Sequence, residues 1–414
     1  MKIKMNHVAL ASLALICMVE SSQAMQVAGE NLEIYGTLYP EYNVTNYTDG
    51  SATGTASNSM QSKKVTPGTL TQQLAPIQKT QLNWSQSYIG FKGVKPFGDY
   101  NIGFDFQGVM GKNVDSSISS GGQQNLFTDT RDAFVLVAKK GIGTFQFGQM
   151  DTIYKEWGDI ARMLGVSSSN FVSTSGVLSK VGWKTAGGDT SFNTRIGNQT
   201  RWISDDFNGF QAGISYRADP NRTTTQNQSL NAAAIRWTQG KYYASIQQET
   251  HNDYRTFSGT GATESATTLL SANPGSKDVG KRFTLGYNEQ KYHIGFDVSQ
   301  LQFSESATTA GKFTNFTTNT WQMSADYNIT PQIVLAANRA VGADGSCSVL
   351  GGGKCTTTGI GGTLTSLGAK YEFDKNIGLF ALYAQNRNGS NAIIASSAIG
   401  GNVTNMAMGV LVKF

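Results

Sequence analysis

The sequence of 414 residues is short of charge, proline, cysteine and histidine. Charged residues make up 15% of the chain, whereas ordinary soluble domains carry roughly 25%. With 7 prolines, 3 cysteines and 3 histidines, the chain has little material for a metal site or a histidine-based catalytic site. The net charge of +5 comes from scattered basic residues, so no basic patch predicts nucleic-acid binding. We therefore expect no cofactor, no metal and no nucleic-acid partner.

The few histidines also have no suitable partner for catalysis. His293 precedes Asp297 by four residues, which on a strand separates them by roughly 13 Å. That distance is too long for a hydrogen-bonded pair. The sequence also shows no nucleophile motif, phosphate-binding glycine loop or metal-ligand spacing. The sequence therefore argues against an enzyme.

Long apolar runs are missing from all but the first residues of the chain. Met1–Ala24 begins with Lys2 and Lys4, continues with the apolar run Val8–Val19 and ends in small residues, a pattern typical of a secretory signal peptide. A membrane anchor is the alternative, but Glu20 ends the run before the roughly 20 apolar residues that a spanning helix needs. We expect cleavage after Ala24, with residues 25–414 forming a single domain.

Two cysteines, Cys347 and Cys355, lie beyond this leader in a segment rich in Gly, Ser and Thr. In an oxidising compartment two such cysteines are expected to form a disulfide that closes a loop. Two thiols with no neighbouring histidine make a poor zinc site. We predict a Cys347–Cys355 disulfide.

Glycine and short alternating segments are what the chain has in quantity. It contains 47 glycines, and its mean hydropathy is −0.28. In Tyr100–Val109 the even positions from Tyr100 to Phe106 are aromatic or aliphatic, and the odd positions from Asn101 to Gln107 are Asn, Gly, Asp and Gln. The segment that starts at Tyr292 alternates in the same way. Such a period of two predicts strands with one apolar and one polar face.

About 16 segments of this kind follow one another along the chain. Their connections alternate between short turns and long polar loops. The long loops are predicted at Thr45–Gln81, Met150–Asn193, His251–Lys281 and Gly342–Gly362. Tight turns at one end and long loops at the other are typical of a transmembrane barrel.

The last predicted strand, Asn402–Phe414, shows the alternation most clearly. Met406 and Met408 lie on the same face as Phe414, and Asn405 lies on the opposite one. A terminal aromatic is typical of the closing strand of an outer-membrane barrel, where aromatic residues lie at the membrane interface.

Taken together, the segments predict an all-β fold. This many strands, each with one polar face, cannot be covered by helices, because the chain has no segments to form them. Closure into a transmembrane antiparallel β-barrel removes the exposed sheet edges. A barrel of about 16 strands encloses a water-filled lumen.

The chain resembles the general porins of the β-proteobacterial and neisserial type. The residues that carry the resemblance are spread from end to end of the chain: Leu32–Gly36, Ser87–Gly93, Arg131–Val135, Gly143–Gln149, Gly209–Gly213 and the final strand. The resemblance implies a homotrimer of about 16-stranded barrels, each with a third outer loop that folds inward and narrows the pore. It also implies that the assembly machinery of the outer membrane recognises Phe414.

The segment Asp151–Arg195 follows the fifth predicted strand and is the candidate for this constriction loop. Its first part, Tyr154–Leu164, is predicted to form a short helix with Glu156 and Asp159 on one face. Asp151, Glu156 and Asp159 are therefore the candidates for the acidic side of the constriction. As an alternative, Lys155–Asp159 and Asp159–Arg162 are ordinary ion pairs on a helix surface.

The resemblance places the basic side on the opposing barrel wall. Arg131 and Lys92 match its basic positions, and Lys79 and Arg195 are further candidates. Acidic and basic groups across a narrow gap create a transverse field that orients polar solutes. Tyr88 and Gln149 stand where the family usually has arginine, so the sequence predicts no ion preference.

The function that these observations favour is passive diffusion of ions and small hydrophilic solutes across the outer membrane of a Gram-negative bacterium. The expected partners are outer-membrane lipids, the barrel-assembly machinery and two further copies of the chain. One alternative is a substrate-selective channel, which needs an aromatic ladder along the lumen, and Tyr88 is one possible rung. Another is a surface adhesin or antigen, suggested by the long polar loops.

Overall fold

The structure is a computed structural model. The residues it describes are 25–26, 32–48, 77–84, 87–110, 127–159, 164, 192–220, 222–224, 227–253, 275–306, 313–352, 357–390, 392 and 400–414. The predicted signal peptide and Cys355 lie outside these residues.

Strands dominate the described residues. They are β1 (Met25–Gln26), β2 (Glu33–Leu38), β3 (Glu41–Tyr47), β4 (Ile77–Asn83), β5 (Tyr88–Phe97), β6 (Tyr100–Met110), β7 (Phe127–Lys139), β8 (Gly143–Asp151), β9 (Arg195–Ile203), β10 (Phe210–Arg217), β11 (Ser229–Gln239), β12 (Tyr242–Asn252), β13 (Lys277–Asn288), β14 (Tyr292–Ser304), β15 (Phe313–Asn328), β16 (Ile333–Gly342), β17 (Ser346–Val349), β18 (Gly362–Glu372), β19 (Ile377–Asn388) and β20 (Val403–Lys413). The helix α2 (Ile153–Gly158) follows β8.

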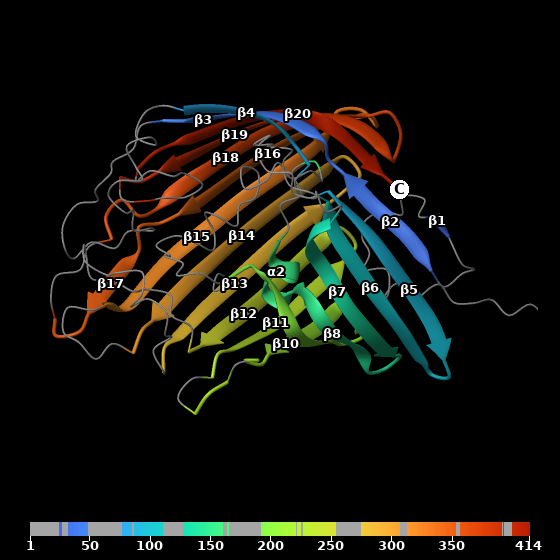
Figure 1. The fold of residues 1–414 in the computed structure, drawn as a ribbon, viewed down its shortest axis with the longest axis horizontal. Coiled ribbons are helices and arrows are strands. Elements are labelled where there is room, and N and C mark those ends of the chain that lie inside the picture. The colour runs from blue at the N-terminus through green and yellow to red at the C-terminus, as the bar shows by residue number, and fades with distance from the viewer. Residues whose placement is uncertain are drawn as a thin grey trace, which may run out of the picture.

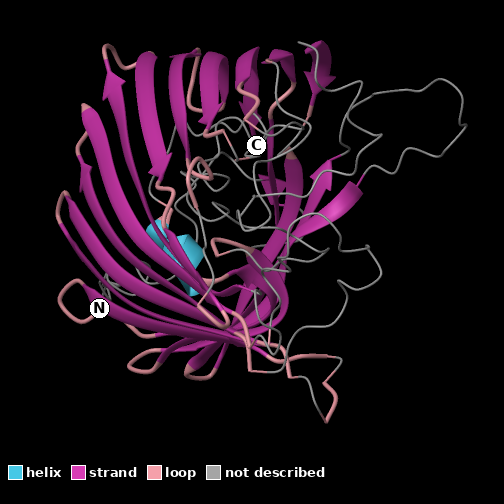
Figure 2. Cartoon of the chain, turned by 90° about the vertical axis from the view of Figure 1, so that its left-hand side faces the viewer, coloured by secondary structure: helices cyan, strands magenta, loops and turns pink. Residues whose placement is uncertain are grey.

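These strands form a closed antiparallel barrel of 16 strands, which confirms the predicted fold (Figures 1 and 2). Three barrel strands are interrupted and consist of β2 with β3, β4 with β5 and β16 with β17, while β1 pairs only with β2. The last strand, β20, closes the wall by pairing with β19 on one side and with β2 and β3 on the other.

The connections between the strands differ in length at the two ends of the barrel. Short turns join β5 to β6, β7 to β8, β11 to β12, β13 to β14, β15 to β16 and β18 to β19. The connections after β3, β6, β8, β12 and β19 are much longer and leave from the other end. The predicted alternation of turns and loops is thereby confirmed. Among the described residues, no helix is long and apolar enough to cross a membrane.

The barrel has its apolar side chains outside and many polar side chains inside. In β14, the outward side chains Tyr292, Ile294, Phe296 and Val298 are 37–39% exposed, whereas Asp297 and Ser299 point inward and are almost fully buried. In β20, Met406 and Met408 are exposed and Asn405 is buried. Both strands face as their sequences predict. This arrangement suits a wall between lipid and an aqueous lumen.

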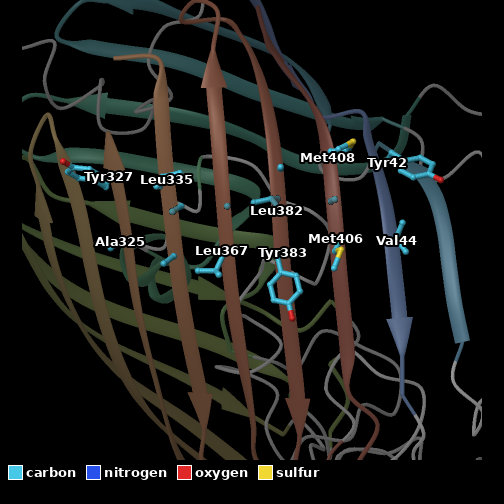
Figure 3. A pocket seen from close by; sticks show the side chains of 15 residues that line it. Tyr42, Val44, Ala325, Tyr327, Leu335, Leu367, Leu382, Tyr383, Met406 and Met408 are labelled. Atoms are coloured by element: carbon cyan, nitrogen blue, oxygen red, sulfur yellow. The ribbon is translucent and has the colours of Figure 1, made fainter. Parts of the chain in front are cut away.

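The outer face is not uniform. An apolar hollow of about 920 Å³ lies on the outside of the closing region, and Figure 3 shows the side chains that line it. Its lining combines small residues such as Ala337 and Ala381 with larger ones such as Tyr42, Met406 and Met408. The hollow thus lies where the last barrel strands meet the first.

The structure corrects several details of the sequence-based expectation. The helix after β8 ends at Gly158, so Asp159 is its C-cap and not part of a longer helical face. His251 lies in β12 and is fully buried, not in a loop. Cys347 lies in the short strand β17 and is disulfide-bonded. Its pairing with Cys355 stays a prediction. Local sequence does not reveal these boundaries, because the neighbouring strands decide where the ladders end.

Candidate functional site

Helix α2 lies inside the barrel, against the inner face of β10–β13 (Figure 1). It begins directly after β8, where the Thr152 hydroxyl accepts a hydrogen bond from the Lys155 backbone N–H at 3.3 Å. Such N-caps satisfy one of the unpaired N–H groups of the first helical turn. The cap therefore fixes the point at which the chain leaves the wall and enters the lumen.

Apolar contacts hold the helix to the wall. Ile153, Tyr154 and Trp157 are at most 2% exposed and pack with small wall residues such as Ala232 and Ala234. Burial of one such aliphatic side chain stabilises the contact by about 1.5–3 kcal/mol. The helix thus rests in part on small apolar residues of the lumen wall.

Gly213 of β10 makes this close approach possible. A Cβ at this position would lie 2.8 Å from Ile153 Cδ1 and 3.0 Å from Trp157 Cη2. Contacts under 3.0 Å require atoms to move. The absence of a side chain at Gly213 therefore lets the helix lie directly on the strand.

Three buried arginines on β9, β11 and β13 surround the docked helix. They are Arg201, Arg236 and Arg282. Arg236 stacks on the Trp157 ring at 4.4 Å and donates two hydrogen bonds to Gln211 Oε1. Arg282 Nε donates to Asp297 at 2.5 Å and lies 5.6 Å from the Tyr154 ring. These cations anchor the helix and are themselves neutralised or covered.

The predicted acid Glu156 takes part in this anchoring. Its carboxylate forms an ion pair with Arg201, whose guanidinium also donates to Gln146 Oε1 at 2.7 Å and to the Asp151 carbonyl at 2.9 Å. The Glu156 side chain keeps 29% of its surface exposed. It is thus both an anchor and a carboxylate that lumen water can reach.

The third predicted acid, Asp159, lies at the end of the helix and is exposed. Its backbone N–H donates to the Lys155 carbonyl at 2.9 Å. Arg282 interacts electrostatically with the carboxylate, and Gly158 leaves room for the guanidinium, since a Cβ there would lie 2.4 Å from it.

A second group of charges lies on the wall where α2 begins. The Asp151 carboxylate is 2.9 Å from Lys155 Nζ and 3.2 Å from an Arg195 nitrogen. Arg195 Nε also donates to Asp132 at 2.7 Å. We call Asp132, Asp151, Lys155 and Arg195 the wall cluster. Each of its side chains remains 19–24% exposed.

Arg131 belongs beside this cluster. It interacts electrostatically with Asp132 and Asp151, and its guanidinium lies 4.6 Å from the centre of the Tyr88 ring. An irregular register between β6 and β7 falls next to Arg131, so two consecutive residues of β7 contribute charges here. The predicted pair of Arg131 and Asp151 is therefore brought together on one wall, not on two opposing walls.

Lys92 lies elsewhere on the lumen wall. It forms an ion pair with Glu33 at 3.0 Å and lies 4.7 Å from the Tyr35 ring. The strand register places it level with Phe134, three residues or roughly 10 Å along the strand from Arg131. Next to it, the Tyr35 hydroxyl donates to Asp105 at 2.5 Å. Lys79, another candidate, lies on β4 beside Tyr47.

The sequence did not single out Asp132, Arg201, Arg236 or Arg282. The signal that reveals the arginines is their position in alternating strands. Arg236, for example, stands between the outward Ile235 and the partly buried Trp237. Such a charged residue at an inward position, flanked by outward apolar residues, marks the lumen wall.

The chemistry of the lumen is that of fixed charges and hydrogen-bonding groups. Burial raises the pKa of the Tyr154 hydroxyl above its usual range, so this group stays neutral at ordinary pH. No group of three or more His, Cys, Asp and Glu side chains among the described residues is arranged to hold a metal ion.

Comparison with known proteins supports the architecture. A family model described as Gram-negative porin matches residues 9–410. No curated protein sequence matches the chain.

Solved structures of outer-membrane proteins share the fold at low sequence identity. The anion-selective porin from Comamonas acidovorans is 15% identical, with a TM-score of 0.62 over 92% of this chain and 99% of its own. The trimer form of the outer-membrane protein OmpT from Vibrio cholerae is 14% identical, with a TM-score of 0.57 over 92% and 99%. The outer-membrane channel DcaP of Acinetobacter baumannii is 12% identical, with a TM-score of 0.57 over 94% and 100%.

Proposed function

This chain belongs to the Gram-negative porin family, and we propose that the wall cluster, Arg131 and the acidic side of α2 together form the constriction of its pore. As a porin, it is a multi-pass protein of the outer membrane and a channel for passive diffusion.

The observation that carries the proposal is a charged helix inside a barrel whose outer face is apolar and whose inner face carries many polar side chains. Outward side chains such as Ile294 and Met408 are apolar, while inward ones such as Asp297 and Asn405 are polar and buried. A helix docked on the inner wall takes up part of the cross-section. Since α2 carries Glu156 and begins next to the wall cluster, ions and solutes pass close to fixed charges at this level.

Acids and bases of the constriction lie on the same stretch of wall, as alternating charges. Asp151 pairs with Lys155 and Arg195, so its carboxylate mainly positions these two cations. Arg131 and Glu156 contribute the charges that solutes meet first. We infer that anions and cations both pass and that these two residues set the balance. Lys92, paired with Glu33 below this level, contributes less.

The aromatic residues of the lumen favour general diffusion over a substrate-selective channel. Tyr88 is 6% exposed, and Arg131 covers its ring. Tyr35 is 9% exposed, and Lys92 lies over it. Neither ring offers a free face on which a sugar ring can stack, so these residues do not form an aromatic ladder.

We propose that three copies associate through the outer faces of the first and last barrel strands. The apolar hollow of about 920 Å³ lies there, and the small residues that line it let a neighbouring subunit approach closely. Trimeric porin structures with this fold support a homotrimer. We further propose that residues 1–24 are a signal peptide and that the barrel-assembly machinery recognises Phe414.

Planar-bilayer recording of the purified protein tests the proposal. The expected result is ohmic conductance in steps that close in threes, together with swelling of liposomes in small sugars. A folded protein, shown by its heat-modifiable mobility on a detergent gel, that gives no conductance would contradict the channel. Channels that close in a single step would contradict the trimer but not the channel.

A further inference from the structure

An arginine stands on the lipid-facing side of the barrel. Arg339 is exposed and occupies an outward position of β16, between Ala337 and Val341 on the same face. Across the ladders it lies opposite Met323 of β15 and Thr365 of β18. A charge on the lipid face is costly inside the hydrocarbon layer unless a polar partner accompanies it. Arg339 therefore indicates a binding partner on the outer face.

The strands around Arg339 offer it no carboxylate on their outer face. In β3, β15, β16, β18, β19 and β20, as far as the structure describes them, the acidic residues are Glu41, Asp326 and Glu372. All three occupy inward positions in the alternation of their strands. The partner of Arg339 is therefore not a carboxylate of these strands.

A second arginine and two hydrogen-bonding side chains accompany Arg339. The register places Arg339 level with Thr365 of β18 and Gln385 of β19. Arg387 follows on the same face of β19, two residues nearer the loop end, and its Nε donates to Gln385 Oε1 at 3.0 Å. Two strand spacings and two residues put the Cα atoms of the arginines about 12 Å apart. Their long side chains can therefore converge on one group.

The apolar hollow of the outer face begins directly beside this row. Ala337, Leu367 and Tyr383 line it and lie level with one another, one outward position nearer the turn end than Arg339 (Figure 3). Its volume of about 920 Å³ lies within the roughly 300–1,000 Å³ of ligand sites. Two cations above an apolar hollow match the two parts of a lipid, an anionic headgroup and an acyl chain.

The chemistry and the level of the arginines identify the lipid. A guanidinium group forms two parallel hydrogen bonds with a phosphate, which makes arginine well suited to a phosphorylated headgroup. Arg339 lies three residues before the loop end of β16, and the long loops of such barrels face the outside of the cell. The lipid within reach is therefore that of the outer leaflet, the phosphorylated glycolipid lipid A.

We propose that a lipid A molecule binds at this place, with a phosphate on Arg339 and Arg387 and an acyl chain in the hollow. Thr365 and Gln385 supply further hydrogen bonds to its headgroup. The inference goes beyond the proposed channel, because the lipid site does not depend on ion conduction. The lipid lies at the border of the proposed subunit contact, with which it shares the hollow.

Lipid binding to the purified full-length protein tests the site. The protein is mixed with detergent micelles that contain lipid A, and native mass spectrometry measures the bound lipid. Arg339→Gln is expected to lower the affinity about tenfold, as loss of one charge-assisted hydrogen bond does. Lys281→Gln is the matched control, because it removes the same charge from an outward position of β13, which does not line the hollow. Wild-type affinity of Arg339→Gln in a heat-modifiable, folded barrel would overturn the site.

Further probes separate the headgroup from the chain and the lipid from a subunit. Dephosphorylated lipid A should bind the wild type as weakly as lipid A binds Arg339→Gln, and combining both losses should add little. Ala337→Trp, which fills part of the hollow, should also lower the affinity. Equally tight binding of the phospholipid phosphatidylglycerol would overturn the assignment to lipid A. Loss of trimers in Arg339→Gln at unchanged lipid affinity would assign the arginine to a neighbouring subunit and overturn the lipid site.

Discussion

Phe414 and Gly36 close the barrel by exchanging two backbone hydrogen bonds. The Gly36 N–H donates to the Phe414 carbonyl at 2.9 Å, and the Phe414 N–H donates to the Gly36 carbonyl at 3.2 Å. The Phe414 ring lies over the glycine, since a Cβ at residue 36 would be 2.6 Å from its Cζ. The last residue and the first barrel strand therefore depend on each other.

Deletion of Phe414 is expected to reduce the amount of barrel that inserts into the outer membrane. It removes both hydrogen bonds and the ring at the seam, whereas the lumen residues stay unchanged. The channels that do insert should have wild-type conductance. Quantification of heat-modifiable protein in outer-membrane fractions, with single-channel recording, checks both parts. Phe414→Tyr is the control and should insert normally. Equal insertion of the deletion variant would contradict the prediction.

Gly36→Ala is expected to destabilise the same seam by about 1–3 kcal/mol, a typical cost of overpacking. Besides the Phe414 ring, the new methyl would meet the Tyr88 carbonyl oxygen at 2.7 Å. This oxygen belongs to the backbone of a paired strand, so it cannot move away as a side chain can. The temperature of the gel-mobility shift should fall. Gly197→Ala is the matched control, because the only atom of the described residues that a Cβ there would meet is Gln149 Oε1, at 3.6 Å. If the mobility of both variants shifts at the same temperature, the close packing at Gly36 does not stabilise the closure between the first and last strands.

Neutralising Arg131 is expected to raise the permeability of cations relative to anions. Arg131→Gln leaves Asp132 and Asp151 with one cation fewer nearby. The reversal potential in a tenfold salt gradient should move by on the order of 10 mV, out of the ~59 mV of a perfectly selective pore. Lys375→Gln, in the tight turn after β18, removes the same charge away from the constriction. An unmoved reversal potential would remove Arg131 from the ion path.

Glu156→Gln is expected to shift selectivity in the opposite direction, toward anions. The amide can still accept a hydrogen bond from Arg201, which also keeps its bonds to Gln146 and the Asp151 carbonyl. The helix should therefore stay in place and the charge alone should change. Reversal-potential measurement checks the sign, with Glu289→Gln, in a short turn, as control. A shift toward cations would show that Glu156 acts only through its ion pair.

Gly213→Leu is expected to displace α2 from the wall and to lower the conductance. The added side chain occupies the space of Ile153 and Trp157, so the helix must move further into the lumen. Single-channel recording gives the size of the effect. Gly197→Leu on β9 introduces the same side chain at a position where a Cβ has a single neighbour among the described residues, Gln149 Oε1 at 3.6 Å, and should conduct more nearly as the wild type does. If both variants conduct equally, the docking surface of the helix is placed incorrectly.

The sequence predicted the faces of the strands well, because the direction of a side chain along a strand is a local property. The alternation in Tyr292–Ser299 assigns outward and inward residues without knowledge of the neighbours. The same holds for Met406 and Met408 in the closing strand. The number of strands followed from counting such segments and the turns between them.

The candidate site was only partly predictable. Arg131 and Asp151 were predicted as candidates because each stands in a recognisable segment, and the structure places them near one another. Arg201, Arg236 and Arg282 lie on three strands, 35 and 46 residues apart along the chain, and only the register of the barrel brings them under α2. The buried apolar cluster that Leu164 joins on the inner face of β16, β19 and β20 left a weaker trace, since Val334 to Ala337 is apolar on both faces.

The sequence by itself determined that this chain forms a barrel with lipid outside and water inside. The alternation of apolar and polar side chains and the tight turns both depend on residues that are close together in the sequence. Only the tertiary structure decided which side chains meet inside the barrel. It placed α2 on β10–β13 and Leu164 on β16–β20, and it put Arg131 beside Asp151 instead of across from it. These placements depend on the register of 16 paired strands, in which one residue of slip would turn every side chain to the other face.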